Sequence, residues 1–149
     1  LKMDIVYNGY YEEKRSRFYC LMSHVKSLEE MKQLKEEALN KEKSIKHCVS
    51  VVYFIDLNGN LQTNISNSGE PIKVCEKIML ALKKNKIENI AVMISRHYGG
   101  TPLGANNLSK AYYNAFDEYH VKYNLSAMEN LFAGYINARL DMYLDILQD

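Results

Sequence analysis

The sequence predicts one α+β domain over about residues 1–120 and a C-terminal appendage over residues 121–149. Segments with the two-residue hydrophobic period of strands alternate with segments that have the period of helices, in the order strand, strand, helix, hairpin, helix, strand, helix. Hydrophobic residues make up 47% of the chain and charged residues 25%, which is the balance of an ordinary soluble domain. A chain of 149 residues is also long enough to bury its own core.

Two strands are predicted first. Residues 4–11 mix β-branched and aromatic types, and residues 16–25 do the same. The dipeptide Asn8-Gly9 predicts a turn or a bulge between or within these strands. Ser27 and Glu30 then have the spacing of a capping box, which predicts a helix to about Lys43 with a solvated face of alternating Lys and Glu.

A β-hairpin and a second helix come next. Residues 46–57 and 60–66 have strand composition, and Asn58-Gly59 between them is a strong hairpin signal. The run from Ser68 to Pro71 combines a capping residue, an acidic residue and a proline suited to a first turn, so a helix is predicted to about Lys84.

The next strand is predicted to lie at the centre of the sheet. Residues 87–95 form a nearly continuous apolar run, as in a strand buried on both faces, and Arg96 marks its end. A loop with three glycines follows, and residues 108–119 have helical spacing. The tail fits either a helix or, over residues 136–146, an alternating strand; the capping pair Ser126 and Glu129 favours the helix.

Composition excludes several classes of protein. The net charge of +1 gives no whole-chain case for nucleic acid or membrane binding, no apolar run is long enough to span a bilayer, and the start has no secretory apolar region. We therefore expect a cytoplasmic protein. Cys20, Cys48 and Cys75 lack metal-ligand spacing and are interpreted as structural thiols, so no metal or cofactor is expected.

The segment from Arg96 to Lys110 is the candidate site. Backbone N–H groups of a loop with Gly99, Gly100 and Gly104, at the start of a helix, can hold a phosphate or a carboxylate, and the two cationic side chains add positive charge. The loop lacks the endings of nucleotide-binding motifs, so a tight structural turn remains the alternative. Arg96 itself either binds a ligand, caps a carbonyl or pairs with Glu70.

Two further features bear on function. We expect Arg15 and Arg17 to join the candidate site as one electropositive surface. Tyrosines beside Lys and Arg could stack on RNA bases, although half-buried packing is the alternative. No convincing nucleophile and base are found, so no catalytic residue is assigned. The tyrosines concerned are Tyr10, Tyr11, Tyr98, Tyr112 and Tyr113.

Several motifs in one order resemble the Impact/YigZ-like family, with an Impact N-terminal-type domain. The resemblance covers about residues 11–119, and its most specific part is the stretch from Arg96 to Gly104. It implies an α+β fold like the second domain of the fifth small-subunit ribosomal protein, with a four-stranded sheet covered by helices. The motifs are Arg15-Ser16-Arg17-Phe18, Lys46-His47-Cys48, Ser68-Gly69-Glu70-Pro71, Ser95-Arg96-His97-Tyr98-Gly99-Gly100, Leu103-Gly104 and Lys110-Ala111-Tyr112.

The resemblance implies a non-catalytic binding module in translation or stress response. Eukaryotic relatives bind the activator of a starvation-responsive initiation-factor kinase, and bacterial relatives have been suspected of nucleic-acid binding. The expected partner is a protein, the ribosome or RNA, without DNA sequence specificity, and the appendage could mediate homo-oligomerisation. The alternative is a small enzyme or sensor that binds a phosphorylated or carboxylated metabolite at the glycine loop.

The chain departs from the family at the second loop. Asn67-Ser68 stand where the family has acidic residues, and residues 72–76 replace a small-residue run found in bacterial members. Glycines allow close backbone approach, and this chain lacks the glycines that bacterial members have in this second loop. A site shared between the second loop and the glycine loop after Arg96 is therefore in question. Bacterial relatives often carry a second ferredoxin-like domain, of which residues 136–146 could be the first strand.

Overall fold

The computed structural model describes residues 5–25, 27, 29–33, 36, 47–67 and 69–148. It has a five-stranded sheet with the strand order β1-β2-β5-β3-β4, and every neighbouring pair is antiparallel. The strands are β1 (Ile5–Glu13), β2 (Ser16–His24), β3 (His47–Ile55), β4 (Leu61–Ser66) and β5 (Ile90–His97).

The α+β prediction is confirmed, but the sheet has five strands rather than the four that the resemblance implied. β1 and β4 are the edge strands, because each pairs with one neighbour. β5 lies at the centre, as its apolar run predicted, with residues Ile90 to Ile94 buried. It continues through Arg96 to His97, so the prediction that Arg96 ends the strand was wrong by one residue.

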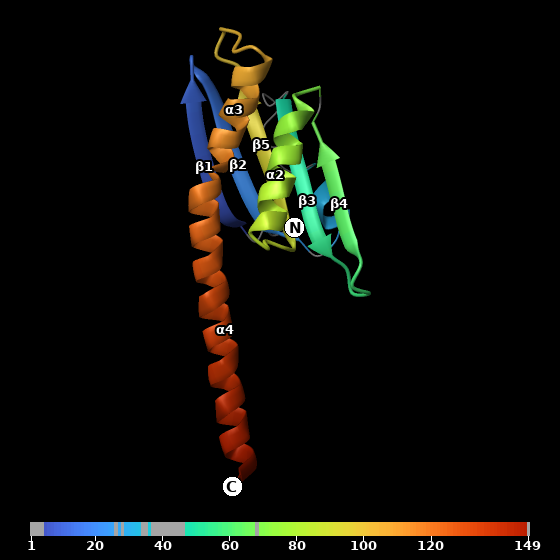
Figure 1. The fold of residues 1–149 in the computed structure, drawn as a ribbon, viewed down its shortest axis with the longest axis vertical. Helices are drawn as coiled ribbons and strands as arrows, with labels where there is room; N and C mark the ends of the chain where they lie inside the picture. Colours follow the sequence, from blue (N-terminus) through green and yellow to red (C-terminus); the bar gives the residue numbers. More distant parts are fainter. Residues whose placement is uncertain are drawn as a thin grey trace. The chain divides into compact units, whose positions relative to one another are not determined.

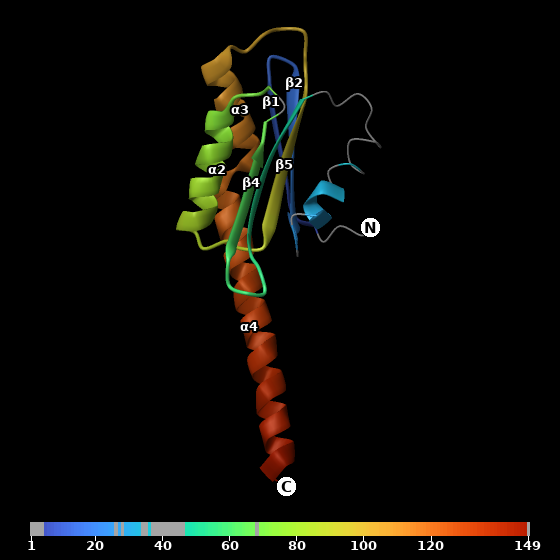
Figure 2. The ribbon, with the colours of Figure 1, turned by 90° about the vertical axis from the view of Figure 1, so that its right-hand side faces the viewer.

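Two helices cover one face of this sheet, as Figures 1 and 2 show. They are α2 (Ile72–Lys84) and α3 (Ala105–Phe116). Helix α2 packs against β3 and α3, and α3 packs against β1 and β2. Their buried side chains meet the inward face of the strands, where Phe18 touches the ring of Tyr112 edge-on at 5.0 Å between centroids. This contact and its apolar neighbours form the main core.

A smaller core lies on the other face of the sheet. Residues 29–33 are helical there, and Met31 packs with Val52, Phe54 and Met93. The Ser27 hydroxyl accepts a hydrogen bond from the Glu30 N–H at 3.0 Å, which confirms the predicted N-cap. Most of the remainder of that predicted helix, to Lys43, lies outside the described residues.

The turns follow local chemistry. The hairpin at Asn58-Gly59 is confirmed, and Gly59 adopts φ +81°. The carboxylate of Asp56 accepts the backbone N–H of Asn58 and Asn60, and these bonds hold its pKa below the ordinary value. The turn between β1 and β2 instead uses Lys14 and Arg15, both with positive φ.

Asn8-Gly9 is neither a turn nor a bulge. Both residues lie in register within β1, opposite Leu21 and Cys20. A Cβ at Gly9 would stand 2.0 Å from the carbonyl oxygen of Ala115. Glycine is therefore needed because α3 packs against the strand backbone, a requirement that no local pattern reveals.

The contacts divide the chain into two compact units, residues 1–118 and 119–149. Helix α4 (Glu118–Gln148) makes up nearly all of the second unit, so the strand alternative for residues 136–146 was wrong. Asp117, with φ 51°, separates α3 from α4 inside the predicted helix 108–119. No helix in the described parts of the chain is long and apolar enough to cross a membrane.

Candidate functional site

Strand alternation brings Arg96 to the helix-covered face of the sheet. Ile90, Val92, Ile94 and Arg96 are two residues apart in β5 and share one face, and the first three are buried. Arg96 lies directly across from Phe18 in β2 and from His47 in β3. It therefore sits at the end of the core, where the sheet passes from apolar to polar side chains.

A tight turn before α2 delivers an acidic side chain to the same place. Gly69 adopts φ +79°, the Glu70 N–H donates to the Asn67 carbonyl at 2.7 Å, and the Asn67 amide donates to the Glu70 carbonyl at 2.6 Å. Pro71 is the N-cap residue of α2 and makes no side-chain cap, so the predicted start at Ser68 was too early. This turn points Glu70 into the fold, where its side chain is 4% exposed.

Glu70 joins two basic side chains. Its Oε1 accepts from an Arg96 terminal nitrogen at 2.6 Å and lies 2.7 Å from His47 Nδ1. The side chains of Arg96 and His47 are 13% and 40% exposed. Burial disfavours the charged guanidinium, but Glu70 outweighs that effect, so the pKa of Arg96 is raised above its ordinary value. Arg96 therefore pairs with Glu70, which is one of the roles that the sequence left open.

Two polar atoms of this cluster have no hydrogen-bond partner in the described part of the chain. They are Arg96 Nε and the Tyr112 hydroxyl, both buried. Burial is the main reason that the pKa of Tyr112 is raised, and the nearby Arg96 lowers it by a smaller amount. Buried polar groups without partners are rare in native proteins.

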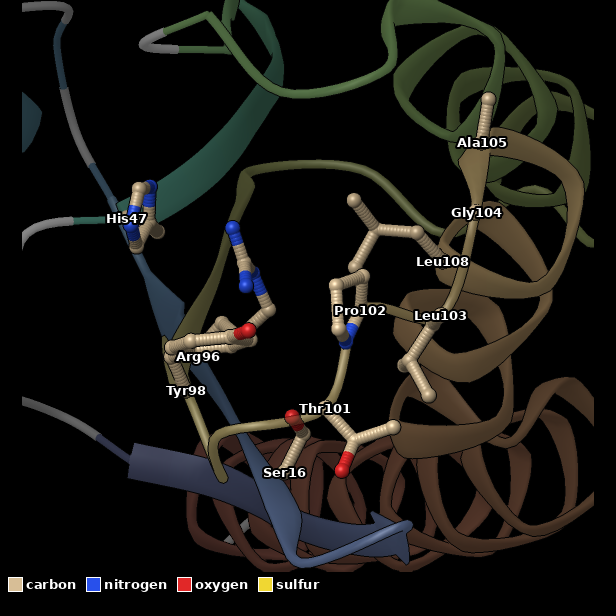
Figure 3. A pocket seen from close by; sticks show the side chains of 10 residues that line it. All are labelled: Ser16, His47, Arg96, Tyr98, Thr101, Pro102, Leu103, Gly104, Ala105 and Leu108. Carbon is tan, nitrogen blue, oxygen red and sulfur yellow. The ribbon is translucent and has the colours of Figure 1, made fainter.

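A pocket of about 450 Å³ opens beside this cluster. Figure 3 shows the guanidinium of Arg96 reaching into the space between His47 and Pro102. One wall is polar and the opposite wall, from the β5–α3 loop and α3, is largely apolar. The lining residues are Ser16, His47, Arg96, Tyr98, Thr101, Pro102, Leu103, Gly104, Ala105 and Leu108.

Helix α3 begins at the wall of this pocket. Gly104 is its N-cap residue, with φ 79° and no side-chain cap, and Ala105 follows at the wall. The first N–H groups of a helix have no partner within the helix and carry partial positive charge. Together with Arg96 on the opposite wall, they make the pocket suited to an anionic group.

The predicted site residues are only partly brought together. Arg96 and Gly104 line the pocket, and Glu70 reaches it through Arg96. The other predicted residues are not among its lining side chains, and Lys110 is exposed farther along α3. The residues away from the lining are Arg15, Arg17, Gly99, Gly100 and Lys110.

Gly99 has a structural role. Its N–H donates to the Ser16 hydroxyl at 3.0 Å, and a Cβ would stand 2.2 Å from the backbone of Arg15. The glycine therefore lets the β5–α3 loop pack on the turn between β1 and β2. Gly100 has φ +94° and open space around its Cα, so backbone conformation alone explains this glycine.

Of the tyrosines considered for base stacking, Tyr112 is buried, Tyr11 and Tyr113 are half-buried, and Tyr10 and Tyr98 are exposed. Tyr112 is fully buried, and Lys77 lies 4.0 Å above the ring of Tyr113. Tyr98 stands exposed at the pocket, whereas Tyr10 is exposed on a different part of the sheet and pairs with Tyr19 at 5.1 Å. Base stacking is thus open to Tyr98 and Tyr10 but not to Tyr112.

No local sequence pattern indicated the roles of His47, Ser16 and Tyr112. His47 lies opposite Arg96 because β3 and β5 are neighbours, and this strand pairing joins residues 49 positions apart. Ser16 receives the Gly99 N–H across 83 positions. The only signal for these residues was their place within the family motifs, since sheet order cannot be read from spacing.

The cysteines lie outside this site and are buried. Burial raises the pKa of the Cys20 thiol, and it raises that of Cys75 to about 11, so both favour the protonated form. Among the described residues, no group of His, Cys, Asp or Glu could hold a metal ion.

The fold and this site define a small α+β domain with an anion-accepting pocket at the end of its central strand. Residues 14–120 match the Impact N-terminal domain, which is more than two thirds of the chain. The chain therefore belongs to the Impact family.

Curated relatives agree with this assignment. An IMPACT family member of Haemophilus influenzae is 32% identical over 112 residues, which cover 72% of this chain and 52% of that protein. YigZ of Escherichia coli is 33% identical over 68% of this chain and 50% of its own length, and YvyE of Bacillus subtilis is 29% identical over 70% and 48%. The chain thus spans about half the length of these relatives.

Solved structures share the fold. A crystal structure of a hypothetical protein matches with a TM-score of 0.66 and 22% identity, over 80% of this chain and 62% of that one. The two-domain translational regulator Yih1 matches with a TM-score of 0.46 and 14% identity, over 80% of this chain and 46% of its own. The first match shows the fold alone, and the second is too distant to carry an argument.

Proposed function

We propose that this chain is a non-catalytic binding module associated with translation, and that its pocket holds an anionic group of a partner macromolecule. Family membership supports the general role. The observation that carries the specific proposal is that Arg96 lines a pocket against which α3 begins. A partner anion would lie beside this guanidinium and would satisfy the first N–H groups of the helix.

Among the expected partners, a protein fits the charge better than RNA or the ribosome. RNA binding requires several cationic contacts to phosphates. The pocket offers one guanidinium, already neutralised by Glu70, beside apolar side chains such as Leu103 and Leu108. The chain as a whole has a net charge of only +1.

The test is affinity capture from a native lysate with and without RNase, using wild type, Thr101→Glu and Thr101→Gln. Thr101 lies in the exposed part of the pocket lining, so the added carboxylate should repel an anion while the neutral glutamine should not. We expect wild type to capture a protein partner whether or not RNase is present. Thr101→Glu should recover about tenfold less of this partner, and Thr101→Gln should recover as much as wild type. Lys110→Ala, outside the lining, should capture like wild type.

Equal capture by all four proteins would contradict the pocket assignment. Loss of the partner on RNase treatment would point to RNA or the ribosome. In that case Lys110→Ala should reduce the salt slope by about 0.7, since it would remove one contact to a single strand.

The alternative function remains a small enzyme or sensor for a phosphorylated or carboxylated metabolite. One observation favours it: His47 Nδ1 is held by the buried Glu70 carboxylate, as in pairs that orient a histidine for proton transfer. A pocket of about 450 Å³ is also large enough for a metabolite. Saturable turnover of a supplied ester that is lost with His47→Gln would establish this function and contradict the binding module.

A further inference from the structure

The pocket has two chemically different sides, and together they restrict what can occupy it. Arg96 on one wall and the first N–H groups of α3 on the opposite wall attract an anion. Pro102, Leu103 and Leu108 form an apolar side. A group that fills both sides must carry a negative charge close to an apolar substituent.

The charge of the cluster favours an anion with a single charge. Arg96 contributes +1 and Glu70 contributes −1, so the pair is neutral before His47 is considered. The start of a helix adds about half a positive charge. A phosphate monoester, which carries about −1.5 to −2 at neutral pH, would leave about −1 to −1.5 uncompensated beside the buried Glu70 carboxylate. A carboxylate would leave only about −0.5 uncompensated.

We propose that the pocket binds the C-terminal carboxylate and the apolar last side chain of a partner polypeptide. The carboxylate lies beside Arg96 and the first N–H groups of α3, and the side chain lies against Leu103 and Leu108. This inference rests on the proposed function and names the chemistry of its partner. Capture of chain ends by free backbone N–H groups is a known mode of peptide recognition.

The surroundings of the pocket fit a polypeptide rather than a small acid. Tyr98, Thr101 and Pro102 line the pocket and are not buried, so the chain that precedes the terminal residue can leave towards solvent. Arg96 lines the pocket, so its guanidinium can donate to a carboxylate oxygen. A charge-assisted hydrogen bond of this kind is among the stronger polar contacts.

The experiment titrates the full ¹⁵N-labelled chain with acetyl-Ala-Ala-Leu as the free acid and as the C-terminal amide. The two peptides differ only in the charge of the terminal group. We expect the free acid to bind at least about tenfold more tightly than the amide. The amide signals that move should be those of residues 98–108 and not those of β4, at the sheet edge.

Further probes separate the two sides of the pocket. Acetyl-Ala-Ala-Asp, without an apolar last side chain, and phenyl phosphate should both bind more weakly than acetyl-Ala-Ala-Leu. Leu103→Ala should weaken the binding of acetyl-Ala-Ala-Leu by about tenfold, because an apolar contact is lost. Lys110→Ala, outside the lining, should leave its affinity unchanged. Circular dichroism and thermal unfolding establish that each variant folds.

Equal affinity for acid and amide, tighter binding of phenyl phosphate, or no shift at residues 98–108 would overturn the inference. Acetyl-leucine that binds as tightly as the tripeptide would overturn the assignment to a polypeptide end. These outcomes are distinct from failure of the proposed function, which is tested by capture with Thr101→Glu and could succeed with a partner that presents another anionic group.

Discussion

At the scale of single residues, the buried pair of Glu70 and Arg96 explains why the predicted site is less electropositive than its sequence suggests. We expect Arg96→Ala to lower the free energy of unfolding by about 3–5 kcal/mol, because Glu70 would keep only His47 as a partner. Urea unfolding measures this loss, with the exposed Lys110→Ala as the control. An Arg96→Ala protein as stable as wild type would show that the pair is not buried in solution.

Removal of the unpartnered Tyr112 hydroxyl, unlike that of the Arg96 side chain, should not lower the free energy of unfolding. Tyr112→Phe removes a buried polar group without breaking a hydrogen bond seen in the structure. The protein should therefore be unchanged or up to about 1 kcal/mol more stable in urea. A loss greater than that would mean that the hydroxyl bonds to Arg96 in solution.

Two adjacent glycines should respond differently to alanine. Gly99→Ala places a methyl group against the backbone of Arg15, so we expect a loss of about 2–3 kcal/mol. Gly100→Ala meets open space and loses about 1 kcal/mol through its positive φ alone. Chemical unfolding of both variants compares them, and a larger loss at Gly100 would contradict the described packing of the loop.

At the scale of elements, a hydrogen bond ties the last turn of α3 to the carboxylate of Glu118, just beyond the end of that helix. The Tyr113 hydroxyl donates to Glu118 at 2.6 Å, and this bond is the main reason that the pKa of Glu118 lies below its ordinary 4.5. Because the folded value is depressed, the stabilisation is complete above pH 4.5 and is lost as the pH falls through the folded value.

Glu118→Gln should therefore make the melting temperature less dependent on pH below 4.5. The variant loses the charge while its amide oxygen can still accept from Tyr113. Melting curves over this range, with the exposed Glu88→Gln as a control, test the prediction. Parallel curves for wild type and Glu118→Gln would contradict it.

The elements themselves were largely predictable, because their signals are local. The hairpin at Asn58-Gly59, the N-cap at Ser27 and the central strand β5 follow from turn chemistry, capping and a continuous apolar run. The role of Gly9 and the break at Asp117 were not predictable. Gly9 is required by contact with α3, and Asp117 lies inside a helical pattern that continues on both sides.

At the scale of the whole molecule, the candidate site depends on contacts between distant segments. The sequence indicated that Arg96 and Gly104 lie near a helix start, and the pocket confirms that both line one space. It could not indicate that His47 would lie opposite Arg96, because the order of strands in the sheet is set by tertiary packing. Arg15 and Arg17, which were expected to join this site, belong to the neighbouring turn and strand and are not among the residues that line the pocket.

That the C-terminal appendage, residues 121–149, packs against a domain or a partner stays a prediction. Helix α4 exposes apolar side chains near its end, including Leu140, Leu144 and Leu147. Such a surface is expected to pack against a domain or a partner, and self-association is one form of this. Sedimentation at increasing concentration measures it; a monomer with a tail that is flexible by NMR would contradict the expectation.

The central claim is that the pocket beside Arg96, and not another exposed surface, contacts the partner. A photo-crosslinking residue placed at Tyr98 or at Tyr10 tests this directly, because the two side chains are 54% and 51% exposed but only Tyr98 lines the pocket. We predict crosslinks to the RNase-resistant partner from position 98 and none from position 10. Crosslinks from position 10 alone would contradict the account.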